Sequence, residues 1–130
     1  SLGDLPELLE ETIHDPIRTS LLEAWDKLDG TLNRLAPLDV IDRCRDLLSI
    51  VFGQLSEEPN RDLSDAIIAY LKNKKGEDAH SSAGRIVARL HARGKPNEQK
   101  ARGLRPPTDT DAQLALRCVG IILVDLGWAQ

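Results

Sequence analysis

Aromatic residues are scarce in this chain of 130 residues, making up only 3% of it, and methionine is absent altogether. Any core must therefore be built from leucine, isoleucine, valine and alanine. This composition favours helices over sheets, because sheet faces draw heavily on aromatic and β-branched side chains. Methionine is missing even at position 1, so we expect either a processed chain or a piece of a larger polypeptide.

Long apolar runs and metal-binding patterns are also missing. The longest apolar stretch, residues 118–126, falls short of the roughly 18 residues of a membrane span, and no signal peptide is visible. Two cysteines, Cys44 and Cys118, cannot form a disulfide framework, so we expect a cytoplasmic protein with both thiols in its core. No metal or cofactor is predicted, since no phosphate loop is present and zinc spacing is lacking among His14, His80 and His91.

Apolar residues recur three or four positions apart over most of the chain, which places them on one face of a helix. Proline, glycine and capping residues separate these segments. Helices are predicted over residues 4–14, 16–35, 38–55, 62–74, 81–93 and 111–126. Ser81 or Ser82 is expected to cap the fifth of them, and Thr108 or Thr110 the last. The fold class is therefore all-α, a compact bundle of five or six mostly antiparallel helices.

The third predicted helix carries the widest apolar stripe and is expected to be central. Its stripe consists of Ile41, Cys44, Leu47, Leu48, Val51, Phe52 and Leu55. In the fifth helix Ile86, Val87 and Leu90 are expected to point inward. Residues 94–107 hold two glycines and three prolines and are predicted to form a long loop. We expect an acidic helical segment, residues 1–37, to pack on a bundle formed by residues 38–130.

Charge is distributed unevenly along the chain, whose net charge is −4. Residues 1–71 hold 6 basic and 15 acidic side chains, whereas residues 72–105 hold 10 basic and 3 acidic ones. Such a basic segment is typical of a phosphate or nucleic-acid contact. It could equally neutralise the acidic half of the same fold or of a second copy, and no aromatic side chains interleave with it to stack on bases.

The candidate anion-binding residues lie in the fifth helix and in the loop after it. Three arginines four positions apart form one stripe on that helix, and arginine forks suit phosphates and carboxylates alike. The full candidate set is Arg85, Arg89, Arg93, Lys95, Asn97, Lys100, Arg102 and Arg105. Of the nearby histidines, His91 is expected to be partly buried or capping, and His80 to be a solvated loop residue.

Three short segments resemble HEPN-like helical domains, in particular those at the C-termini of abortive-infection and related bacterial proteins. Residues 42–48 read DRCRDLL and resemble the CR-x-x-L helix of that family, and residues 90–98 read LHARGKPNE and resemble its segment L-H-x-x-R-N-x-G-N. Residues 107–112 read PTDTDA and resemble its P-T-x-x-D-A entry to the last helix. The resemblance covers residues 38–126 and implies a role in bacterial defence or stress response.

Active members of that family are metal-independent ribonucleases, usually dimeric, with an Arg-polar-x-His motif in which histidine moves a proton and arginine stabilises the phosphate. This chain departs from the motif, because Gly94 follows Arg93 and no histidine comes after His91. Arg85 precedes His91 by six residues, but on one helix this spacing rotates the two side chains about 600° around the axis, well apart. General acid–base catalysis of RNA cleavage then lacks the imidazole that usually moves the proton beside the arginine.

The sequence thus favours a non-catalytic helical binding module, part of a larger bacterial protein. Its partners would be the rest of that polypeptide, a second copy, or RNA or DNA, without a membrane. One alternative is an active ribonuclease that uses Arg85 or Arg93 with His91 across a dimer interface. Another is a purely structural dimerisation domain, in which the basic segment pairs with the acidic N-terminal half of a neighbour.

Overall fold

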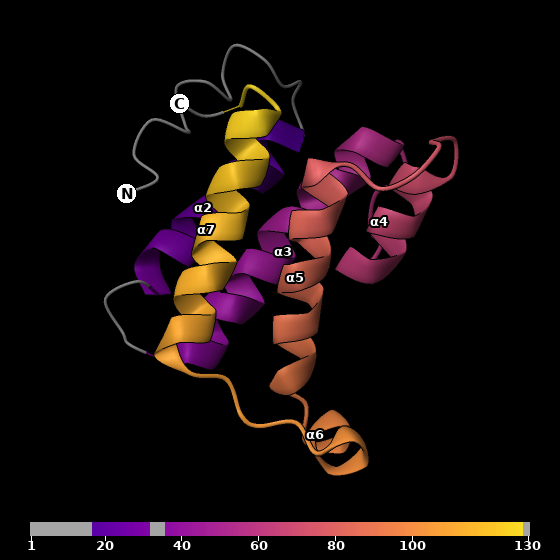
Figure 1. Ribbon diagram of the computed structural model, residues 1–130. Helices are drawn as coiled ribbons and strands as arrows, with labels where there is room; N and C mark the ends of the chain where they lie inside the picture. The colour runs from indigo at the N-terminus through magenta and orange to yellow at the C-terminus, as the bar shows by residue number, and fades with distance from the viewer. Residues whose placement is uncertain (1–16, 32–35, 129–130) are drawn as a thin grey trace.

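The computed structural model describes residues 17–31 and 36–128, and this part of the chain forms six helices and no strand. The helices are α2 (Ile17–Thr31), α3 (Pro37–Ser56), α4 (Leu63–Leu71), α5 (Ala79–Arg93), α6 (Pro96–Arg102) and α7 (Asp109–Asp125). They pack into a bundle, so the all-α prediction is confirmed (Figure 1). The predicted helix 4–14, and His14 with it, lie outside the described residues.

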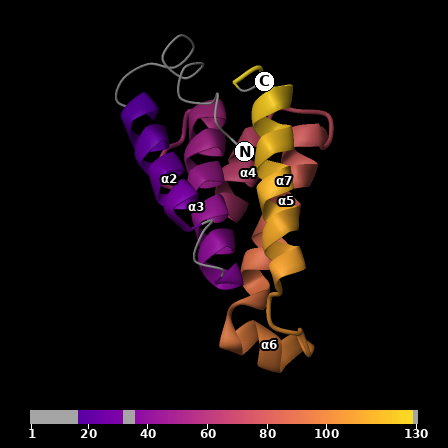
Figure 2. The ribbon, with the colours of Figure 1, turned by 90° about the vertical axis from the view of Figure 1, so that its left-hand side faces the viewer.

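Helix α3 is the centre of the bundle, with α2, α4, α5 and α7 packed around it (Figures 1 and 2). Pro37 occupies its first turn, where a missing N–H breaks no helical hydrogen bond. The helix ends before Glu57, which adopts a left-handed conformation and donates its N–H to the carbonyl of Gln54. The predicted stripe is buried from Ile41 to Phe52, and Leu55 at its end is partly buried.

Helices α5 and α7 lie side by side and antiparallel. His80 at the start of α5 meets Asp125 at the end of α7, and Arg93 at the end of α5 meets Asp111 at the start of α7. Thr108 caps α7 by accepting the N–H of Asp111, as predicted. The pair is thus joined at both ends by polar side-chain contacts.

A glycine sets how closely α5 approaches the central helix. A Cβ atom on Gly84 would lie 2.8 Å from Phe52 and 3.0 Å from Ile67. Real Cβ contacts are essentially never as short as the one to Phe52, so any larger residue would force this buried ring to shift where α5 crosses α3 and α4. This contact packs the first half of α5 against the core. Helix α6 follows the C-terminal end of α5.

The prediction of an unstructured loop over residues 94–107 is wrong, because its first half forms α6. Pro96 begins this helix instead of breaking one, since its fixed φ angle suits the first helical turn. Glu98 and Arg102 form an ion pair of 3.0 Å at a spacing of four residues. Gly103 then ends the helix in the left-handed conformation, with φ at 63°.

Three predicted helix limits are also wrong, the first being the start of the last helix, which is Asp109 instead of residue 111. The fourth helix stops at Leu71 rather than residue 74, because the apolar stripe ends there and the following lysines have nothing to bury. The fifth helix begins at Ala79 because Asp78, not Ser81 or Ser82, is its cap. The Asp78 carboxylate accepts the N–H of Ser81, and the Ser81 hydroxyl accepts the N–H of Asp78.

The earlier start of α5 corrects the expectation for His80. His80 is not a solvated loop residue: it lies in the first turn of α5, where its side chain is 17% exposed and contacts Asp125. Ile86 was expected to point inward but is exposed. The core face of α5 is narrower than predicted, because Ala83 and Gly84 bring the helix close to its neighbours.

Candidate functional site

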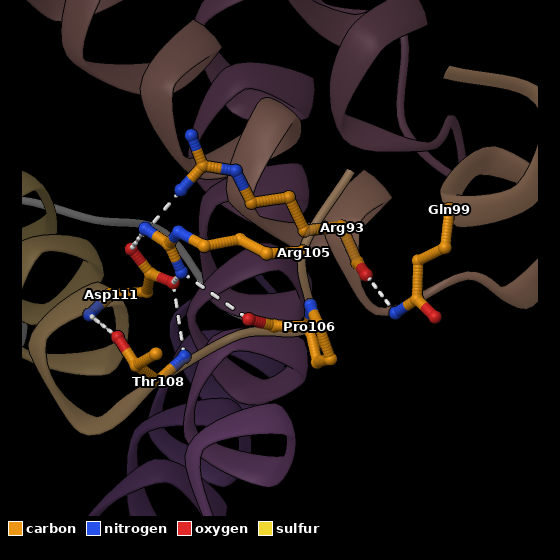
Figure 3. Close-up of polar contacts among 6 residues, drawn as sticks. All are labelled: Arg93, Gln99, Arg105, Pro106, Thr108 and Asp111. Atoms are coloured by element: carbon orange, nitrogen blue, oxygen red, sulfur yellow. Dashed lines mark hydrogen bonds and ion pairs between the residues drawn. The ribbon is translucent and has the colours of Figure 1, made fainter. Parts of the chain in front are cut away.

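The strongest polar cluster of the described residues surrounds Asp111, where α5, α7 and the segment after α6 meet (Figure 3). Asp111 is only 4% exposed. Arg105 donates two hydrogen bonds to its carboxylate, at 2.6 and 3.0 Å, and Arg93 donates a third at 3.1 Å. The N–H of Thr108 donates a fourth at 3.0 Å. All of this donor capacity is directed at one buried carboxylate.

These hydrogen bonds keep Asp111 ionised in spite of its burial. The bonds from Arg105 and from the Thr108 N–H, with the charges of Arg105 and Arg93, lower the pKa of Asp111 to about 2. Burial alone would raise that pKa, so the two guanidinium groups are what make a buried carboxylate tolerable at this position. Arg93 and Arg105 therefore have a structural task, which the basic pattern of the sequence did not reveal.

Two further predicted anion-binding arginines also have acidic partners. Arg85 forms an ion pair with Glu77, which lies just before α5. Arg102 pairs with Glu98 within α6, although its own side chain stays 71% exposed. The three arginines of α5 thus do not form one free basic stripe, because Arg85 and Arg93 are each paired with a carboxylate.

A second group of basic side chains has no such partner. Arg89, Lys95 and Lys100 are exposed, and no ion pair or side-chain hydrogen bond joins them to any residue that the structure describes. Asn97 is likewise exposed. We call Arg89, Lys95 and Lys100 the free basic group. They span the C-terminal part of α5, the junction after it, and α6.

Helix α6 lies at one end of the bundle, beyond the C-terminal end of α5 (Figures 1 and 2). It contains no buried residue, and α5 is the one described helix that it packs against. The side-chain amide of Gln99 donates to the carbonyl of Arg93 and so fastens α6 to α5 (Figure 3). The basic side chains of α6 are therefore carried on a helix that adds little to the core.

His91 is partly buried, as predicted, and faces the central helix. Its Nε2 atom lies 3.3 Å from Oδ1 of Asp42 in α3. Burial lowers the pKa of His91, with help from the charge of Arg45, and burial raises the pKa of Asp42. Both shifts disfavour the charged forms, and the contact with Asp42 directs the imidazole toward α3.

The histidine and the arginines of the predicted catalytic alternative are not brought together within the described part of one chain. The Arg85 side chain turns to Glu77, and that of Arg93 turns to Asp111, whereas His91 turns to Asp42. Each is engaged by a different carboxylate. A joint site for one phosphate would require these contacts to be rearranged.

The cysteines lie in the core, as predicted. Cys44 and Cys118 are both buried, and burial raises the pKa of the Cys44 thiol to about 12. Among the described residues, no group of three or more histidine, cysteine, aspartate or glutamate side chains is placed to hold a metal ion. None of the described helices is long and apolar enough to span a membrane.

No protein-family model, no curated protein and no solved structure matches this chain. The similarity to HEPN-like domains therefore stays a prediction from the sequence. The segment 107–112, which carries part of it, has a structural explanation of its own: Thr108 and Asp111 form the capping box of α7 and Ala112 is buried. The contact between Asp111 and Arg93, which are 18 positions apart, could not be predicted from the helical spacing of the sequence.

Proposed function

We propose that this chain is a non-catalytic helical binding module that contacts an anionic partner, RNA, through the free basic group Arg89, Lys95 and Lys100. Following the sequence resemblance, it would serve a larger bacterial protein of defence or stress response. Unpaired lysine and arginine side chains that neutralise phosphates displace the counterions condensed on the nucleic acid, which supplies affinity without sequence specificity.

The observation that supports this proposal is that α6 is an exposed basic helix with no buried residue. A helix with no buried residue contributes little to the stability of a bundle, yet this one begins with Pro96 in its first turn, ends at left-handed Gly103 and is fastened to α5 by Gln99. It holds Lys100 and follows Lys95 directly, so the exposed charge is on an ordered element at the end of the molecule. Its basic side chains are therefore accessible to a partner.

The contacts of His91 support the non-catalytic part of the proposal. Metal-independent cleavage of RNA needs a group that moves a proton close to one that stabilises the phosphate charge. Here the imidazole lies against Asp42, and both candidate arginines hold other carboxylates.

The experiment is a mobility-shift titration with labelled single-stranded RNA at low and moderate salt, with cleavage followed on the same gels. Lys95→Glu/Lys100→Glu is compared with Lys72→Glu/Lys75→Glu. The control pair makes the same change of charge at exposed lysines beyond α4. We expect at least a tenfold loss of affinity in the first pair and less than a threefold loss in the second.

Equal losses in both pairs would overturn the assignment to α6, because net charge alone would then explain the binding. No shift by the unmodified chain at low salt would overturn RNA as the partner. Cleavage that disappears in His91→Ala would replace the binding module by a ribonuclease.

A further inference from the structure

Helix α7 is apolar on the side that faces away from the core. Leu114, Ile121 and Val124 are 42%, 54% and 53% exposed, whereas the opposite side of the same helix is buried in the bundle. Their spacing of seven and three residues places them on one stripe. A surface helix normally carries polar side chains on this side, so α7 has the pattern of a helix with a partner on each side.

Along the same stripe lie an open space beside Gly120 and two oppositely charged residues, Arg117 and Asp125. Space is open beside Gly120, where no atom lies within 4 Å of a Cβ position, and a shallow groove runs along Arg117, Gly120, Ile121, Val124 and Asp125. Arg117 has no acidic partner among the described residues. The Asp125 side chain is 47% exposed and contacts His80 through one oxygen, Oδ2.

Arg117 and Asp125 do not satisfy each other within one helix. They are eight positions apart, which separates them by about 12 Å along the axis. In two antiparallel copies of α7 related by a twofold axis near residue 121, Ile121 of each copy lies opposite Ile121 of the other. Arg117 of each copy then lies opposite Asp125 of the other, so both charge pairs form at once.

From this self-complementarity we infer that the outer face of α7 binds a second copy of this chain, with the two α7 helices antiparallel. A twofold interface must match the same patch to itself, and this patch does so in its apolar stripe and in its charges. The acidic segment 1–16 fits less well, because its five acidic side chains complement Arg117 but it holds no basic side chain to complement Asp125. The surface is separate from the free basic group.

The test is sedimentation velocity of the whole chain over a range of concentrations, comparing Ile121→Asp with Ile68→Asp. Ile68 is an isoleucine of α4 that is 59% exposed, so its replacement is a matched control. We expect a concentration-dependent dimer for the unmodified chain and for Ile68→Asp. The dissociation constant should rise at least tenfold in Ile121→Asp, with unchanged helicity by circular dichroism.

Charge exchange tests the orientation without depending on Ile121. Arg117→Asp and Asp125→Arg should each weaken the dimer, and the double variant Arg117→Asp/Asp125→Arg should recover it. A monomer at all concentrations, a dimer that Ile121→Asp leaves intact, or a double variant no better than the single ones would overturn the inference. So would loss of thermal stability in a monomeric Ile121→Asp, since the face would then be covered by the chain's own residues.

Discussion

Two groups of basic side chains at the end of α5 look alike in the sequence and differ in the structure. Arg93 and Arg105 donate to the buried carboxylate of Asp111, whereas the free basic group has no acidic partner in the described part of the chain. A basic segment is therefore a candidate binding surface only where the carboxylates of the same fold do not already pair with it. Charge counts along the chain do not make that distinction.

The largest effect should come from removing the carboxylate that defines the first group. Asp111→Ala leaves two guanidinium groups and the Thr108 N–H without their shared acceptor, which should cost about 2 to 3 kcal/mol in the free energy of unfolding. Asp109→Ala is the control, because Asp109 is an exposed acid in the same helical turn. It should cost at most about 0.5 kcal/mol.

Urea unfolding followed by circular dichroism measures both variants. Similar losses in Asp111→Ala and Asp109→Ala would remove the distinction between the two groups, since the carboxylate would then act only through the helix dipole.

A pH series should give the next largest effect. The pKa of Asp111 is about 2 when folded, below its ordinary value of 3.8, so the folded state favours the ionised carboxylate. The resulting stability is fully present above about pH 4 and is lost as the pH falls toward 2, by roughly 1 to 2 kcal/mol. Asp111→Asn should lack this part of the acid sensitivity, as measured by thermal unfolding between pH 5 and 2. An unchanged pH profile in Asp111→Asn would contradict the role of Asp111.

The smallest effect concerns the attachment of α6. Gln99→Ala removes the side-chain donor to the Arg93 carbonyl, and hydrogen exchange of the amides in residues 96–102 should become severalfold faster. Global stability should change by less than about 0.5 kcal/mol, because α6 buries nothing. Asn97→Ala is the control in the same helix. Faster exchange in both variants alike would mean that Gln99 has no special role in holding α6.

The helices of the core were predictable because their apolar residues recur with the helical period. Ile41, Cys44 and Leu48 form the stripe that made the third predicted helix central, and all three are buried. The short helix α6 was not predictable in the same way. It has no buried stripe, and Pro96 and Gly103, which suggested a loop, begin and end it instead.

The basic residues of the candidate site could be predicted from the sequence, but their contacts with acidic residues could not. All eight anion-binding candidates lie in α5 or in the segment that follows, but which of them are free depends on contacts with other residues of the fold. Arg93 meets Asp111 only because α5 and α7 pack antiparallel. His80 contacts Asp125 of α7 for the same reason. Neither contact can be predicted from the spacing of residues within one helix.

The salt dependence of RNA affinity measures how many phosphates the free basic group contacts. Each phosphate contact to a single strand contributes about −0.7 to the slope of log affinity against log salt concentration, so the three side chains of the free basic group predict a slope of about −2. Arg89→Ala/Lys95→Ala/Lys100→Ala should bring the slope close to zero and leave the unfolding curve unchanged. A slope in this variant equal to that of the unmodified chain would contradict the account, because the contacts would then lie elsewhere.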